Sequence, residues 1–243
     1  MKGQKKNEGN LILLASLAAL CIASFASAAP PKQGPIQVFI LAGQSNMEGQ
    51  GVVDLEGKDY NDGKGTLVAL MKDPVKAPHF KHLKDGKDQW TVRDDVWVRY
   101  QPENGPVMAG PLTVGFTAYG DKHHFGPELQ FGHVLGDHLD KQVLLIKTAW
   151  GGKSLYKDFR PPSSGDAVGH YYKKMLAEIR KALENLKADF PGYDGRGYVL
   201  AGFTWYQGWN DGVDPKKAVP RSHSRGIYSR YAMRAPLRRL TLS

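Results

Sequence analysis

Three apolar segments of strand length recur along the chain, and each ends at glycine and polar residues. They occupy residues 38–41, 143–146 and 198–205. Short apolar runs bounded by glycine turns are typical of strands that are buried on both faces. Residues 170–186 form the clearest amphipathic segment, with apolar side chains at every third or fourth position, and residues 127–139 predict another helix. Strands that alternate with helices predict an α/β fold with a central parallel sheet.

The turns that follow these three strands carry the candidate chemistry. They read G-Q-S at residues 43–45, G-G at residues 151–152 and G-W-N-D at residues 208–211. In open α/β sheets, ligands bind at the carboxyl ends of the strands. A serine at that edge can act as a nucleophile, and backbone N–H groups or an asparagine amide can stabilise an oxyanion. The alternative for each turn, taken alone, is a helix cap or a plain turn.

The chain between the first and second strands is expected to hold short elements joined by loops. Residues 66–72 predict a short helix, and residues 90–100 alternate as a strand or hairpin arm does. Residues 55–65 and 81–88 read as surface loops, and the glycine-rich residues 105–120 as irregular structure. An insertion of this kind between core elements can build a wall that faces the substrate.

The N-terminus has the pattern of a secretory signal peptide. Lysines precede an apolar segment at residues 11–25, and residues 26–28 form an A-x-A cleavage site. We therefore predict cleavage after residue 28 and a secreted or periplasmic protein with no membrane attachment. A retained N-terminal anchor is the alternative. Cleavage would remove Cys21, the single cysteine, and with it any metal–thiolate site.

The net charge of +9 is concentrated at the C-terminal end. Residues 215–243 hold eight Lys or Arg and no acidic side chain, whereas residues 29–214 carry a net charge of −1. The body therefore has no basic patch of the kind that binds nucleic acid. The abrupt change near Pro215 suggests that residues 215–243 are an atypical tail produced by a frame change or truncation.

The order and spacing of the three turns resemble the SGNH hydrolases. G-Q-S-N-M at residues 43–47 and W-Y-Q-G-x-N-D at residues 205–211 are similar to the sialate O-acetylesterase and acetylxylan-esterase-like branch, carbohydrate esterase family six. The resemblance covers roughly residues 36–214. It implies a flavodoxin-like three-layer fold over a domain of residues 29–214, a carbohydrate O-acetylesterase activity, an acetylated carbohydrate as substrate, and no metal or organic cofactor.

The resemblance also assigns roles to residues. Ser45 is the expected nucleophile, and the oxyanion hole is expected from the Ser45 N–H, the Gly152 N–H and the Asn210 side chain. The supporting residues are expected to be Gln44, Gly208 and Asp211. One departure is Trp209, because many relatives carry an acidic residue there.

The sequence leaves the catalytic base unassigned, with His123, His124 and His170 as open alternatives. In SGNH hydrolases a D-x-x-H block near the C-terminus supplies it, and residues 215–243 contain none, so the fold is expected to be incomplete there. Residues 121–124 spell D-x-x-H but precede the second turn, and we interpret them as a coincidence. Two alternatives stay open. One is an inactive or truncated homologue, and the other is a carbohydrate-binding protein without turnover, whose candidate sugar platforms are Trp90, Trp97, Trp150, Trp205 and Trp209. The oligomeric state and the choice between sialic acid, xylan and other glycans are not determined by the sequence.

Overall fold

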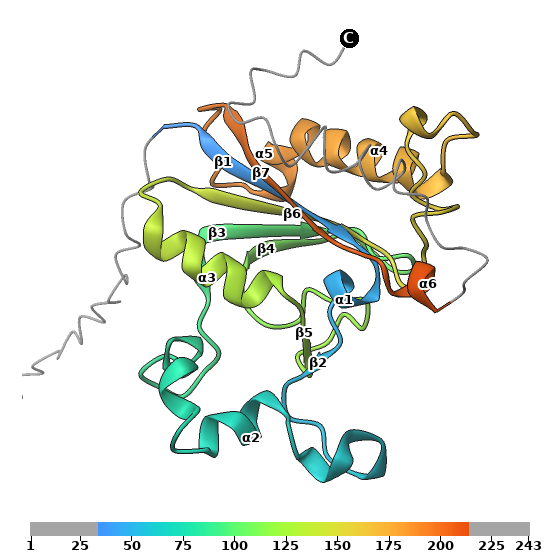
Figure 1. Ribbon diagram of the computed structural model, residues 1–243. Coiled ribbons are helices and arrows are strands. Elements are labelled where there is room, and N and C mark those ends of the chain that lie inside the picture. Colours follow the sequence, from blue (N-terminus) through green and yellow to red (C-terminus); the bar gives the residue numbers. More distant parts are fainter. Residues whose placement is uncertain (1–33, 214–243) are drawn as a thin grey trace, which may run out of the picture. The chain divides into compact units, whose positions relative to one another are not determined.

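The protein contains a five-stranded sheet flanked by helices. The computed structural model describes residues 34–213. The strands run in the order β4-β3-β6-β1-β7, and β3, β6, β1 and β7 are parallel, whereas β4 pairs antiparallel with β3 (Figure 1). The strands are β1 (Ile36–Gly43), β3 (Arg93–Tyr100), β4 (Met108–Leu112), β6 (Val143–Ala149) and β7 (Tyr198–Tyr206).

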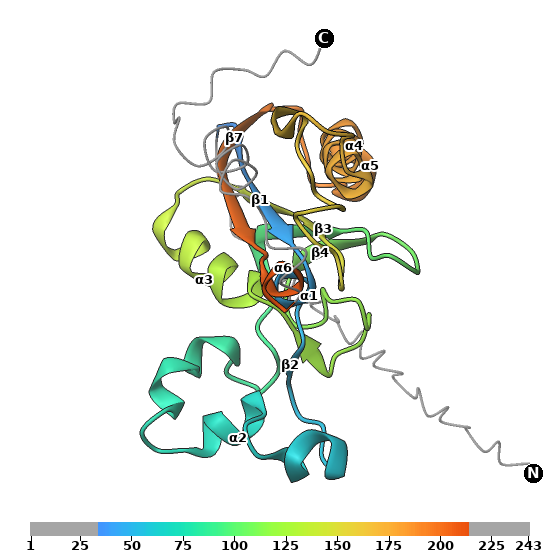
Figure 2. The same ribbon diagram turned by 45° about the vertical axis from the view of Figure 1, so that its right-hand side comes forward.

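Helices cover both faces of this sheet and enclose two hydrophobic clusters. On one face lie α4 (His170–Glu184) and α5 (Leu186–Asp189), and on the other lies α3 (Glu128–His138) (Figures 1 and 2). All seven residues of β6 are buried, because it lies between β3 and β1 and is covered on both faces. This α/β architecture, a sheet of mainly parallel strands between helical layers, is the predicted fold class.

The segment between β1 and β3 forms a separate small cluster below the sheet in Figure 1. It contains α2 (Leu67–Lys72) and three 3-10 helices (Lys58–Gly63, Ala77–His79 and Lys81–Leu83). A two-stranded sheet of β2 (Gly51–Val52) and β5 (His124–Phe125) connects it to the main body. Leu67 and Leu83 pack with Leu129 of α3 and with partly buried aromatic side chains, so this segment shares a small core with the main body.

Most predicted elements are confirmed, with three corrections. Residues 90–100 are not part of an insertion: β3 is a central strand that pairs with β6, and its alternating pattern arises from strand residues facing opposite layers. Residues 105–120 are not all irregular, because they contain β4. β7 is half-buried where a buried strand was expected, because in residues 34–213 it is the last strand of the sheet.

Several predictions fall outside the described residues. The signal peptide at residues 1–28 and the atypical tail at residues 215–243 both lie there, so these domain boundaries stay predictions, as does the incompleteness of the fold. Within residues 34–213, none of the helices has the length and apolar character needed to span a bilayer.

Candidate active site

The three predicted turns meet at one edge of the sheet. Gly43, the last residue of β1, is in register with Ala149 of β6 on one side and Tyr206 of β7 on the other. Because these strands are parallel, the chain segments that follow them leave the sheet side by side. The Trp150 N–H donates to the Gly43 carbonyl at 3.3 Å, and the Gln44 N–H donates to the Tyr206 carbonyl at 3.4 Å.

Ser45 is the first residue of the one-turn helix α1 (Ser45–Glu48), directly after the end of β1. The approach of the strands is so close that a Cβ at Gly43 would lie 2.2 Å from the Tyr206 carbonyl oxygen, which explains the glycine. The Ser45 side chain is partly buried, and its hydroxyl donates to Gln44 Oε1 at 3.4 Å. Gln44 itself is buried beneath the turn and is the N-cap residue of α1.

The second turn, at residues 151–152, packs close to Ser45. A Cβ built on Gly151 would lie 3.7 Å from the Ser45 Cβ, and that of Gly152 would meet nothing. Gly152 has a φ of +71°, a conformation that other residues adopt only with strain. Within residues 34–213, the backbone N–H groups of Ser45 and Gly152 have no hydrogen-bond acceptor. Two donors are therefore available beside the serine hydroxyl.

The third turn is fixed to the second by a buried carboxylate. Asp211 lies in α6 (Trp209–Gly212), and its carboxylate accepts hydrogen bonds from the backbone N–H groups of Leu155 and Tyr156, both at 2.8 Å. Gln207 Nε2 adds a third donor to Asp211 at 2.7 Å and also donates to the Lys153 carbonyl. These bonds tie the chain after Gly152 to the helix that carries Asn210.

Figures 1 and 2 both place α6 beside α1. The side chain of Asn210 is partly exposed and has no hydrogen-bond partner in the part of the chain that the structure describes. Gly208 precedes α6 with a φ of +145° and open space at its Cβ position. Trp209 is 67% exposed, so its side chain is on the surface. Of the other tryptophans, Trp150 is fully buried and cannot serve as a sugar platform.

Sequence reasoning missed a buried carboxylate under the serine turn. Glu48 ends α1, and it accepts a hydrogen bond of 2.7 Å from the Tyr100 hydroxyl. Burial raises the pKa of the Glu48 carboxyl above its ordinary value of 4.5, although hydrogen bonds from Tyr100 and the Gly151 N–H act in the opposite direction. Glu48 therefore links the helix of Ser45 to the neighbouring glycine turn and to β3. The sequence signal was an acidic residue that directly follows the buried Met47.

A second buried pair lies next to it. Lys147 of β6 is wholly buried and donates to Glu128 Oε2 at 2.6 Å and to the Phe116 carbonyl at 2.7 Å. Burial lowers the pKa of Lys147, while the charge and hydrogen bond of Glu128 act to raise it. A lysine in the middle of the apolar run V-L-L-I-K-T-A was the available signal, because such a charge needs a buried partner.

The histidines of the described part of the chain have partners other than Ser45 or make no hydrogen bond to it. Within residues 34–213, no histidine hydrogen-bonds to the Ser45 hydroxyl. The D-x-x-H sequence at residues 121–124 does form a local pair, with His124 Nδ1 at 2.8 Å from Asp121 Oδ1. The His124 ring is buried and stacks on Tyr119 with the ring centroids 3.8 Å apart. His123 pairs instead with Asp54 at 2.7 Å, and this partner raises the pKa of His123.

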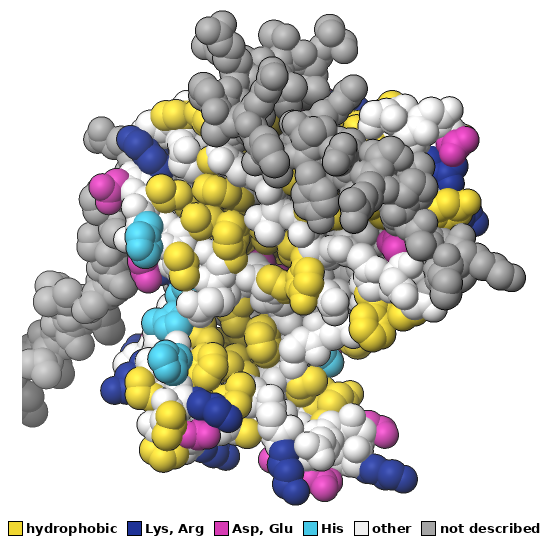
Figure 3. Space-filling model, in the orientation of Figure 1, with side chains coloured by type: hydrophobic (Ala, Val, Ile, Leu, Met, Phe, Trp, Pro, Cys, Tyr) yellow, Lys and Arg dark blue, Asp and Glu magenta, His cyan; other side chains and the backbone are white. Residues whose placement is uncertain are grey.

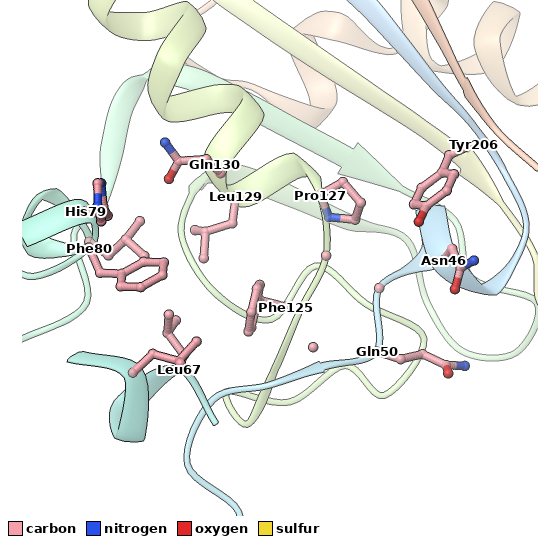
Figure 4. Close-up of a pocket in the computed structure, with 15 residues that line it drawn as sticks. Asn46, Gln50, Leu67, His79, Phe80, Phe125, Pro127, Leu129, Gln130 and Tyr206 are labelled. Carbon is pink, nitrogen blue, oxygen red and sulfur yellow. The ribbon is translucent and has the colours of Figure 1, made fainter. Parts of the chain in front are cut away.

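A pocket of about 750 Å³ opens beside the serine turn. Asn46, Gly49 and Tyr206 belong both to this pocket and to the edge of the sheet. In Figure 4, Phe80, Leu67, Phe125 and Leu129 gather at one end, whereas Asn46, Gln50 and Tyr206 lie at the other. In the space-filling view, hydrophobic side chains are exposed between the main sheet and the segment that joins β1 to β3 and contains α2 (the α2 segment) (Figure 3). Lys and Arg side chains lie around the outer part of the α2 segment. The insertion thus forms one wall of the pocket.

The described residues contain no group of three or more His, Cys, Asp or Glu side chains arranged to hold a metal ion. The arrangement offers a serine hydroxyl, N–H groups of Ser45 and Gly152 that have no acceptor within residues 34–213, and a nearby pocket whose described lining holds no Asp, Glu, Lys or Arg. This set suits an acyl-transfer reaction in which negative charge develops on a carbonyl oxygen.

One comparison with known proteins assigns a family to the chain. The family model for "carbohydrate esterase, sialic acid-specific acetylesterase" matches residues 35–224. None of the curated proteins matches the chain.

Three solved structures are distantly similar to this chain. A protein from Arabidopsis thaliana has 19% identity and a TM-score of 0.44, with 82% of this chain and 68% of that chain covered. A carbohydrate acetylesterase from Xanthomonas citri has 14% identity and a TM-score of 0.39, with 79% and 38% covered. NanS has 14% identity and a TM-score of 0.47, with 83% and 62% covered. The chain thus spans less than two thirds of the last two proteins, and its family assignment rests on the family model.

Proposed function

The chain belongs to the carbohydrate esterase family of sialic acid-specific acetylesterases, and we propose that it hydrolyses O-acetyl esters of carbohydrates with Ser45 as the nucleophile. The observation that carries the proposal is the register of Gly43 with both Ala149 and Tyr206. It brings the turns of Ser45, Gly152 and Asn210 to one edge of the sheet, in the chain order that the motifs predict.

The proposed reaction begins with attack of the Ser45 oxygen on the acetyl carbonyl carbon. The serine proton passes to a base, and the carbonyl oxygen becomes negatively charged. The N–H groups of Ser45 and Gly152 and the amide of Asn210 would donate to this oxygen. The base gives the serine proton to the leaving oxygen as the tetrahedral intermediate collapses, which releases the sugar hydroxyl and leaves an acetyl-serine. Water then loses a proton to the base and attacks the acetyl-serine, which releases acetate and restores the serine. The absence of acceptors for these donors within residues 34–213 supports the assignment.

The proposal needs a base for the serine proton. None of the histidines in the described residues bonds to Ser45, and a glutamine side chain such as Gln44 cannot take up a proton at neutral pH. We therefore assign no base within residues 34–213, and turnover by this chain is the first property to measure.

The test is release of acetate from an acetylated xyloside and from a generic acetyl ester by the protein and by its Ser45→Ala variant. Ser163→Ala, an exposed serine in a 3-10 helix, is the matched control. We expect release that disappears in Ser45→Ala and persists in Ser163→Ala. Asn210→Ala should lower kcat by about 100- to 1,000-fold, the usual cost of losing one oxyanion donor. Equal activity of the parent and Ser45→Ala would refute the proposal.

A second candidate function is carbohydrate binding without turnover. The observation in its favour is that no histidine of residues 34–213 contacts the serine hydroxyl. A folded parent protein that binds an acetylated sugar but releases no acetate, and whose binding persists in Ser45→Ala, would establish this function in place of the esterase.

A further inference from the structure

Within residues 34–213, the lining of the pocket beside Ser45 carries no carboxylate, ammonium or guanidinium group. Its fifteen lining residues include no Asp, Glu, Lys or Arg. The polar groups at the end near Ser45 are amides and a phenol, from Asn46, Gln50 and Tyr206. Such groups hydrogen-bond to neutral hydroxyl and ester oxygens, but they do not neutralise an anion. The single imidazole in the lining, His79, lies at the opposite end beside Phe80 (Figure 4).

The far end of the pocket is apolar and partly aromatic. Phe80 comes from the α2 segment and Phe125 from β5, and in Figure 4 they surround the same space as Leu67 and Leu129. The C–H faces of pyranose rings and the methyl groups of acetyl esters are apolar and pack on such surfaces. A volume of about 750 Å³ exceeds what an acetyl group alone would fill, so the pocket has room for the sugar.

Lys153, which follows Gly152 in sequence, and Lys174 of α4 do not line this pocket. Lys174 forms an ion pair with Glu103 at 2.7 Å, and the Tyr171 hydroxyl donates to the same carboxylate at 2.6 Å. The Lys153 ammonium lies 4.5 Å from the centre of the Tyr171 ring. These side chains face the α4 side of the glycine turn, and none of them lines the pocket.

We propose that this pocket binds an uncharged acetylated sugar and discriminates against anionic sugars such as sialic acid. The inference deepens the proposed esterase function and rests on it for the identity of the reacting ester. The Asn46 end would hold the sugar next to Ser45, and the Phe80 and Phe125 end would contact the ring faces or further acetyl groups of the substrate. A carboxylate placed in the same space would lose its hydration without gaining a cationic partner, which is costly.

The experiment measures binding rather than turnover, so that it does not depend on a base. Ligand-observed NMR on the Ser45→Ala variant, at a pH of about 8 where an ordinary imidazole is uncharged, compares a fully acetylated methyl xyloside with an O-acetylated sialic acid methyl glycoside. We expect the xyloside to bind at least about tenfold more tightly, since about 1.4 kcal/mol corresponds to a factor of ten. Equal or tighter binding of the sialic acid ester, or no binding of the xyloside, would overturn the inference.

Two variants locate the binding and test the charge argument. Phe80→Ala should weaken xyloside binding several-fold, whereas Val75→Ala, a 78% exposed residue of the same segment, should not. Gln50→Lys places a cation on the exposed rim and should strengthen binding of the sialic acid ester about three- to fivefold. If Phe80→Ala and Val75→Ala bind alike while both remain folded, or if Gln50→Lys leaves the sialic acid ester unaffected, the sugar does not bind as proposed.

The two proposals fail separately in this design. Xyloside binding that depends on Phe80, with no acetate released by the parent protein, would leave the pocket assignment standing and reject the esterase. Acetate release that depends on Ser45, with preference for the sialic acid ester, would support the esterase and reject the pocket assignment.

Discussion

The sheet edge around Ser45 and the segment at residues 53–92 use charged side chains in opposite ways. At the sheet edge, Lys147, Glu128 and Glu48 are buried, and each has specific partners. In the segment, pairs such as Lys76 with Asp73 lie at the surface with side chains more than a third exposed. Buried charges tolerate few arrangements, because each one needs a partner, whereas solvated charges tolerate many.

The two regions therefore have different structural roles. The buried network fixes the turn that carries Ser45 relative to the glycine turn beside it. The segment contributes pocket-lining residues such as Leu67, Leu70 and Phe80 from short helices, outside the hydrogen-bonded sheet. We expect substitutions in the network to change stability strongly and substitutions on the exposed side of the segment to change it little. The following predictions test that comparison.

The largest effect is expected for Lys147→Met. It leaves the wholly buried Glu128 without its cation, and breaking a buried pair in this way typically costs about 3–5 kcal/mol. Urea unfolding measures the free energy. The double variant Lys147→Met with Glu128→Gln should recover most of the loss, because no unpaired charge remains. A single variant as stable as the parent would show that the pair does not matter for folding.

His133 should make the protein sensitive to acid. It lies on α3 against His82, its Nε2 has no partner in the described residues, and burial lowers its pKa from 6.5 to about 4. The unfolded chain therefore binds a proton before the folded one does, so stability falls as the pH drops from 6.5 to about 4. The full loss is about 3 kcal/mol.

Urea unfolding of the His133→Leu variant at several pH values checks this prediction. The variant should lack that part of the acid sensitivity, while His79→Gln, an exposed histidine of the segment, should keep it. Identical pH profiles for the parent and His133→Leu would mean that His133 already binds its proton in the folded state with an ordinary pKa.

Asp211→Asn should have an intermediate effect with a local signature. It replaces a carboxylate that accepts from Leu155, Tyr156 and Gln207 by an amide with only one acceptor oxygen. A cost of about 1–3 kcal/mol is expected for donors left without acceptors. Amide hydrogen exchange should accelerate at Leu155 and Tyr156 more than in β6. Exchange that increases evenly over the whole sheet would indicate global destabilisation and contradict a specific link between the turns.

The smallest effect is expected for Lys76→Ala, which removes one member of an exposed ion pair in the segment. Exposed pairs contribute little because water screens them. The urea midpoint should match that of the parent, and acetylated-sugar binding should be unchanged. A shift as large as that of Asp211→Asn would show that the segment depends on its surface charges, against the comparison drawn above.

The sequence predicted the architecture and most of the candidate site. Apolar runs followed by glycine turns identified β1, β6 and β7; for β1 and β6 the reason is that an interior strand is covered on both faces. The same runs placed the Ser45, Gly152 and Asn210 turns at one edge, since parallel strands end together. The element at residues 90–100 was recognised as a strand but not as a central one, because charged residues interrupt its apolar positions and its partner, β6, is more than forty residues away.

The sequence by itself therefore determined the class of fold, the family and the order of the chemical groups, because these are set by local pattern and motif. Only the tertiary structure decided that Glu48 meets Tyr100, that Asp211 holds the chain after Gly152, and that residues from α2, β5 and α3 share one uncharged pocket. Each of these pairs residues that are far apart along the chain. No local pattern encodes such distances, because they follow from how the layers pack.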